Sequence, residues 1–187
     1  MRAVDARPVL ELVSRAAAGG DLTLVGIGGH GGAGKTTLAH AIPEAEIVST
    51  DEFWTGDGFD LERLRREVVE PLACGETARF ASFDWVARAA RGRRLIEPAG
   101  VVVVEGVCAL HRDLRDAYAV RVWVDAPYHV RLARGVARDG EQARRTWVEH
   151  WIPSEEAYVA RDDPVSCAHV VVDGTGDPPG AGAEPSA

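Results

Sequence analysis

The chain has 187 residues, 46% of them hydrophobic and 27% charged, which suits one globular domain and excludes wholesale disorder. Its 21 basic and 29 acidic residues give a net charge of −8, so general binding to nucleic acid or to an anionic membrane is disfavoured. The three cysteines are scattered, and no apolar run approaches the roughly 20 residues that span a bilayer. We therefore expect a cytoplasmic protein with reduced thiols.

The hydrophobic pattern predicts alternating helices and strands along the chain. Helices are expected over residues 5–18, 35–42, 60–72 and 128–160, the last interrupted near Gly140 and Pro153. Short apolar strands are expected over 22–27, 45–49, 101–104, 120–124 and 168–172. Strands that are apolar throughout favour a parallel sheet covered on both faces. Residues 174–187 are rich in Gly and Pro and are expected to be disordered, which leaves one domain over residues 1–173.

The most informative motif lies between the first strand and the second helix. Residues 29–36 match the pattern G-x-x-x-x-G-K-[ST], in which backbone N–H groups bind phosphate oxygens. Lys35, the only lysine in the chain, would reach the β- and γ-phosphates, and the Thr36 hydroxyl would bind Mg²⁺. The nucleotide-binding residues predicted here are Gly29, Gly31, Gly32, Ala33, Gly34, Lys35, Thr36 and Thr37.

The composition also narrows the choice of nucleotide. Guanine-specific GTPases usually carry an Asn-Lys-x-Asp element, and this chain has no asparagine and no second lysine. The sequence therefore predicts ATP with Mg²⁺ as the bound nucleotide, although a preference over GTP rests on this absence alone.

Two acidic residues follow buried strands, at the end of a parallel sheet where ligands bind. Asp51 follows the strand 45–49 and would accept the proton of an attacking hydroxyl and help to hold Mg²⁺. Glu105 ends the four-valine strand and would act as a second Mg²⁺-site carboxylate. The alternatives are a helix or turn cap for Asp51 and a solvated strand end for Glu105.

Three arginines share one face of the predicted helix after residue 128. Arg131, Arg134 and Arg138 are three and four residues apart, and a cluster of this kind can stabilise charge on a transferring phosphoryl group from a mobile lid. The alternative is a solvated helix face paired with nearby acidic residues.

Together these motifs resemble the uridine kinase and phosphoribulokinase group of P-loop kinases, most closely the uridine-kinase-like proteins of high-GC bacteria. The resemblance covers about residues 22–173. The segments that carry it are GIGGHGGAGKTTLA, STDEFW, FASFDWVARAAR, VVVVEGVCAL, VRLARGVARDG and AHVVVDG.

The resemblance implies a role for each matching residue. Asp51 would be the catalytic base, assisted by Lys35, Arg134 and Arg138, and Mg²⁺ would be held by Thr36, Asp51 and Glu105. The acceptor pocket would include Trp54, Phe83, Asp84 and Arg88. This chain departs from the family pattern in its acceptor site and lid: Phe83 replaces a tyrosine, Arg88 stands where a base-contacting histidine would be, and Gly135 replaces a lid arginine.

We therefore expect a P-loop NTPase fold with a five-stranded parallel sheet and a helical lid over about residues 127–160. The expected activity is ATP-dependent phosphorylation of a hydroxyl on a nucleoside or nucleoside-like small molecule. The alternatives are a kinase for another small metabolite, such as a sugar acid, a vitamin precursor or a nucleotide, and a non-catalytic ATP-binding regulator. No nucleic-acid or membrane partner is expected, and a homo-oligomer remains open.

Overall fold

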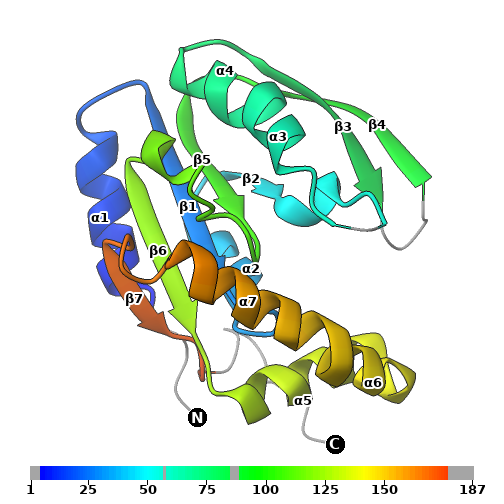
Figure 1. The fold of residues 1–187 in the computed structure, drawn as a ribbon. Helices are drawn as coiled ribbons and strands as arrows, with labels where there is room; N and C mark the ends of the chain where they lie inside the picture. The colour runs from blue at the N-terminus through cyan, green and yellow to red at the C-terminus, as the bar shows by residue number, and fades with distance from the viewer. Residues whose placement is uncertain (1–4, 57, 85–88, 177–187) are drawn as a thin grey trace, which may run out of the picture.

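The computed structural model describes residues 5–56, 58–84 and 89–176. Its centre is a sheet of five parallel strands in the order β2-β5-β1-β6-β7 (Figure 1). This confirms the predicted five-stranded parallel sheet. The strands are β1 (Leu22–Gly29), β2 (Glu46–Ser49), β5 (Gly100–Glu105), β6 (Val120–Asp125) and β7 (Val170–Asp173).

Both faces of the sheet are buried, which explains the uninterrupted apolar strands. On β5, Val102 and Val104 contribute to one hydrophobic core and Val103 to the other, because successive side chains point to opposite faces. One face packs against α1 (Arg7–Ala17) and α2 (Lys35–His40). The other packs against residues of α3 (Leu61–Leu64), α4 (Glu70–Ala73) and α7 (Ile152–Asp162).

A lid of helices follows β6. It consists of α5 (Tyr128–Asp139), which lies beyond the carboxyl ends of the strands, α6 (Arg144–Thr146), and α7, which runs from α6 back across one face of the sheet (Figure 1). The predicted interruption at Gly140 is present, where φ is +89° and α5 ends. The predicted interruption near Pro153 is wrong, because the helix continues from Arg144 to Asp162 through a π-helical turn at Trp147–Trp151.

A π-helical turn accommodates a proline in each of two helices. The π-turn Arg65–Val69 is followed by Glu70 and Pro71, and the π-turn Trp147–Trp151 is followed by Ile152 and Pro153. In each case the residue before the proline donates its N–H to a carbonyl five positions earlier. A proline has no N–H and its ring collides with the carbonyl four residues before it in a regular helix, so the wider turn lets the helix continue.

An antiparallel hairpin that the sequence analysis did not predict lies beside the main sheet. It pairs β3 (Ala78–Asp84) with β4 (Ala89–Ile96). Residues along β3 alternate between buried and more exposed positions, as in a strand with one face on a core. Ala78, Phe80 and Ser82 are buried, while their neighbours are more exposed. The segment between the strands contains no Gly, Pro or Asn to indicate a turn.

Glu52 joins this hairpin to the main sheet. Its carboxylate accepts a hydrogen bond from Ser82 Oγ and one of 2.7 Å from the Arg94 guanidinium on β4. The other Arg94 nitrogen donates to Glu46 Oε1 at 2.7 Å and to the backbone oxygen of Ile47 at 2.9 Å. The hairpin is therefore fixed to β2 and to the turn that follows it.

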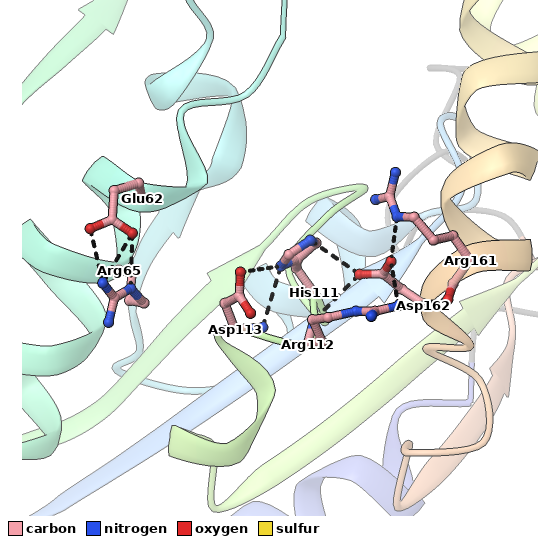
Figure 2. A network of polar contacts seen from close by, with 7 residues as sticks. All are labelled: Glu62, Arg65, His111, Arg112, Asp113, Arg161 and Asp162. Carbon is pink, nitrogen blue, oxygen red and sulfur yellow. Dashed lines mark hydrogen bonds and ion pairs between the residues drawn. The ribbon is translucent and has the colours of Figure 1, made fainter.

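A buried carboxylate fixes the far end of α7. The side chain of Asp162 is fully buried and lies 3.1 Å from His111 Nε2, 3.2 Å from an Arg112 nitrogen and 2.6 Å from Arg161 Nε (Figure 2). Arg115 also donates to the backbone oxygen of Asp162 at 3.0 Å. A buried carboxylate is stable only when it is paired in this way, so α7 is attached firmly to the segment after β5.

The lid contains its own small hydrophobic core around Trp147. This indole is 2% exposed, packs with Val136 and Ile152, and donates from Nε1 to Asp139 Oδ2 at 2.9 Å. A Cβ atom on Gly135 would lie 2.4 Å from the ring. The glycine at the position of the family's lid arginine is therefore required by the tryptophan that packs on it.

Gly135→Ala should destabilise the lid by about 1–3 kcal/mol, because overpacking a buried ring forces side chains and backbone apart. Denaturant unfolding, followed by Trp fluorescence, measures this change. Gly20→Ala is the matched control, since a Cβ atom there meets no other atom within 4 Å. Equal stability of the two variants would contradict the packing described here.

Candidate functional site

The phosphate loop begins where β1 ends. Gly32 and Gly34 have φ values of +74° and +107°, which favour glycine, and the Ala33 N–H donates to the His30 carbonyl at 3.2 Å. A Cβ atom on Gly29 would lie 2.4 Å from the backbone oxygen of Val124. The glycines of the motif are therefore required by the turn and by its close approach to β6.

Lys35 lies at the base of this loop. It is 8% exposed, and its ammonium donates to the carbonyl of His30 at 2.9 Å. This contact turns the Lys35 side chain back towards the loop. The backbone N–H groups of a phosphate loop point to the same region. The buried Lys35 charge is positioned to interact with an anion bound on the loop.

Glu105 lies beside Thr36 at the carboxyl end of β5. The Thr36 hydroxyl donates to Glu105 Oε1 at 3.2 Å, and the carboxylate is 4% exposed. Burial raises the pKa of Glu105, Lys35 lowers it in part, and the charge of Asp51 raises it further. The solvated strand end considered for Glu105 is therefore excluded by its burial.

Asp51 lies on a 3-10 turn, Thr50–Phe53, directly after β2. Ser49 caps this turn by accepting from the Asp51 N–H at 3.3 Å, and Glu52 accepts from the Ser49 N–H at 3.2 Å. Solvent reaches Asp51, yet the protein around it removes enough water to raise its pKa, which the charges of Lys35 and Arg138 lower in part. The N-cap of the turn is Ser49, while Asp51 belongs to its first residues.

The donor set at this edge suits Mg²⁺. Thr36 supplies a hydroxyl, and Glu105 and Asp51 supply carboxylate oxygens, with Asp51 close enough to raise the pKa of Glu105. The described residues contain no group of three or more His, Cys, Asp or Glu that could hold a metal by themselves. Mg²⁺ keeps several waters and needs only one or two protein oxygens beside substrate phosphates, and Thr36, Glu105 and Asp51 carry oxygens of that kind.

Two of the lid arginines, Arg138 and Arg134, have different surroundings. Arg138 is largely exposed, pairs with Asp139 at 2.8 Å, and lies close enough to Asp51 to lower its pKa. Arg134 lies against the phosphate loop and contacts backbone carbonyls there. Its guanidinium donates to the carbonyls of Gly32 at 3.3 Å, Gly174 at 2.6 Å and Gly176 at 2.8 Å.

Arg134 thereby holds the start of the tail against the phosphate loop. Residues 174–176 form a turn, and a Cβ atom on Gly174 would lie 2.0 Å from the carbonyl oxygen of Ala33. The first three residues of the predicted disordered tail are therefore part of the site, and residues 177–187 lie outside the described part of the chain.

The predicted acceptor residues are described only in part. Trp54 is half-buried and its ring meets that of Phe59 edge-on, with centroids 5.0 Å apart. Phe83 is half-buried on β3, and Asp84 ends that strand, although its side chain is outside the described residues. Arg88 also lies outside the described residues.

Sequence reasoning missed three residues that organise the site. Glu52 connects the Asp51 turn to the hairpin, Asp139 holds both Arg138 and Trp147, and Glu155 of α7 accepts a hydrogen bond from the Gly31 N–H at 3.0 Å. A capping pattern, a serine followed three residues later by a glutamate, was the only local signal for Glu52. The other two contacts join residues whose proximity depends on the fold.

The loop after β1, the parallel sheet and the helical lid define a P-loop kinase fold. The family model for the phosphoribulokinase / uridine kinase family matches residues 50–173, so the chain belongs to this family. A uridine kinase from Macrococcus caseolyticus is 28% identical over 150 residues, which cover 66% of this chain and 72% of that protein.

Two solved structures share the fold. A possible uridine kinase from Bacillus stearothermophilus superposes with a TM-score of 0.63 at 16% identity, over 88% of this chain and 98% of that one. A proposed fructose transport system kinase from Silicibacter sp. TM1040 gives 0.64 at 20% identity, over 89% and 98%. The family consists of kinases with hydroxyl acceptors, and an ATP-dependent small-molecule kinase is the class that this membership supports.

Among the residues that the structure describes, no helix combines the length and the apolar character needed to cross a membrane.

Glu105→Gln should raise the melting temperature of the ligand-free protein at about pH 8 by a few degrees. The pKa of Glu105 is raised in the folded state, so its contribution to stability is present at low pH and lost as the pH rises through that pKa. The neutral amide avoids this loss, and the difference should shrink towards about pH 4.

Thermal unfolding followed by circular dichroism measures this effect. Glu11→Gln, on the exposed side of α1, is the control for a surface carboxylate. A lower melting temperature of Glu105→Gln at the higher pH would show that the hydrogen bond to Thr36 outweighs the cost of burial.

Proposed function

We propose that this protein transfers the γ-phosphoryl group of ATP to a hydroxyl of a nucleoside or nucleoside-like small molecule. The observation that carries this proposal is the position of Asp51, on a capped turn at the same sheet edge as the phosphate loop. Its carboxylate has a raised pKa and lies within electrostatic reach of Lys35. A base with a pKa raised towards neutrality is suited to accept a proton from an attacking hydroxyl.

Each part of the proposed phosphoryl transfer has a candidate residue. The loop N–H groups and Lys35 would hold the phosphates, and Asp51 would orient the acceptor hydroxyl and accept its proton. Arg138 would stabilise negative charge on the group in transfer, since it is exposed and near Asp51. Bound Mg²⁺ would supply charge neutralisation between the phosphates, held by Thr36 and Glu105. We assign Arg134 to holding residues 174–176 against the phosphate loop, and not to direct contact with the transferred phosphoryl group.

Two observations favour a nucleoside as the acceptor. Half-buried Trp54 and Phe83 offer aromatic surfaces for stacking a planar group, and the relative from Macrococcus caseolyticus is a uridine kinase. Arg88 favours a second candidate, an acceptor with a carboxylate, phosphate or several carbonyl oxygens, because arginine cannot accept a hydrogen bond from a base.

A screen of single metabolites for ADP release tests the proposal and distinguishes the two acceptor classes. A nucleoside that stimulates ADP release supports the first candidate, and an anionic acceptor supports the second. A non-catalytic regulator would show only slow hydrolysis whatever is added.

Lys35→Ala should abolish acceptor-dependent ADP release, because no other lysine exists to replace it.

Asp51→Asn should lower kcat by about 10²–10⁴-fold while nucleotide binding is retained, as expected for loss of a positioned base. Steady-state kinetics and calorimetric ATP binding measure the two quantities. Asp21→Asn, an exposed carboxylate remote from the site, is the control, and an equal loss of ATP affinity and kcat in Asp51→Asn would make Asp51 structural.

Arg138→Ala should move the acid limb of the kcat/KM profile to higher pH. Asp51 must be ionised to act as a base, and the Arg138 charge lowers its pKa, so removing that charge raises the pH at which activity is lost. Arg145→Ala removes an equal charge from an exposed lid residue paired with Glu149 and should leave the limb in place. If the acid limb of Arg138→Ala stayed in place, the Arg138 charge would not influence the pKa of the catalytic base.

A further inference from the structure

A carboxylate from the lid lies on the phosphate loop. Glu155, on the first turns of α7, is 7% exposed, and its Oε2 accepts the hydrogen bond from the Gly31 N–H at 3.0 Å. A Cβ atom on Gly31 would lie 2.7 Å from Glu155 Oε1 and 2.7 Å from the Trp147 ring. Glycine at this loop position therefore leaves room for the lid to reach the loop backbone.

The groups around Glu155 are suited to binding an anion. Arg131 is 6% exposed, and its Nε and Nη1 have no hydrogen-bond partner within the described part of the protein. Arg131 Nη1 lies 3.9 Å from Glu155 Oε2, and the buried Nδ1 of His30 lies 3.7 Å from the same oxygen. A buried guanidinium with two unused donors is costly unless an anion completes its hydrogen bonds.

The same groups border the phosphate loop. A Cβ atom on Gly32 would lie 2.5 Å from the backbone oxygen of Arg131, so α5 touches the loop directly. The Glu155 charge also acts on the rest of the site, since it raises the pKa of both Asp51 and Arg138. A carboxylate in this position neutralises part of the positive potential that phosphate oxygens would meet.

We propose that Glu155 is an internal anion that holds the lid on the phosphate loop and that the phosphates of the nucleotide displace it. The Gly31 N–H would then donate to a phosphate oxygen in place of the carboxylate, and the unused Arg131 donors would gain an acceptor. The carboxylate thus competes with phosphate for the loop, and ATP binding includes the cost of breaking its contact with Gly31. This inference rests on the proposed nucleotide site but is independent of the acceptor and of phosphoryl transfer.

Glu155→Gln should bind ATP·Mg²⁺ about tenfold more tightly than the unmodified protein, measured by calorimetry without acceptor. The amide keeps the shape and an acceptor for Gly31, but it loses the charge that strengthens this bond and repels phosphate. Inorganic tripolyphosphate should gain affinity in the same way, whereas adenosine should not. Glu149→Gln is the matched control, because it removes one charge from an exposed lid residue that does not touch the loop.

A structural readout accompanies the affinities. The amide proton resonance of Gly31 should shift upfield in Glu155→Gln without ligand, since a neutral acceptor forms a weaker hydrogen bond. Glu155→Ala is measured in parallel, with circular dichroism to confirm folding, and should also bind ATP·Mg²⁺ more tightly.

Weaker or unchanged ATP affinity in the folded Glu155 variants would overturn the proposal, as would a lower kcat at unchanged affinity, which would make Glu155 a positioning residue. Failure of the proposed kinase function has a different signature, namely no acceptor-dependent turnover or no ATP binding by the unmodified protein.

Discussion

The register of three parallel strands is the constraint on which the site depends. Ile27 of β1 pairs with Glu105 of β5, and Glu105 in turn pairs with Ser49 of β2. Because parallel strands end at the same edge, the phosphate loop after β1, the carboxylate at the end of β5 and the Asp51 turn after β2 begin side by side. A slip of one residue in either pairing would turn the β5 valines to the wrong faces of two buried cores, so packing on both faces maintains the geometry of the site.

Electrostatics then determine how this site can bind a polyanion. The chain carries a net charge of −8. Asp51 and Glu105 lie within electrostatic reach of the buried Lys35, and the charges of Asp139 and Glu155 act on Asp51. Burial raises the pKa of Asp51 and Glu105, so their negative charges are costly without a cation. A divalent ion held by these groups would offset that cost, and the lid arginines would add positive potential at the loop.

The hairpin and α7 are both attached to the main sheet by apolar packing and by ionic contacts. Phe80 of the hairpin and Tyr158 of α7 belong to the same hydrophobic core, while Glu52 with Arg94 and the buried Asp162 supply the ionic contacts (Figures 1 and 2). Dense packing allows few intermediate arrangements, so the lid is expected to move as a unit about the Asp162 attachment. Gly135, where the family resemblance implies an arginine, lies in the core of the lid and outside the phosphate loop itself.

The sequence by itself determined the sheet, the phosphate loop and the two carboxylates at strand ends, because each is encoded by consecutive residues: buried valines, a contiguous glycine motif, and an acid directly after a strand. Tertiary structure decided the rest. The β3–β4 hairpin lacks a turn residue that would reveal it, and Arg134 donates to carbonyls where the helical pattern indicated a phosphate clamp. Gly31 and Glu155 are 124 residues apart, and their contact exists only because α7 crosses the loop. Local patterns show which face of a helix is polar, but the partner of a polar group is chosen by packing, which brings distant segments together.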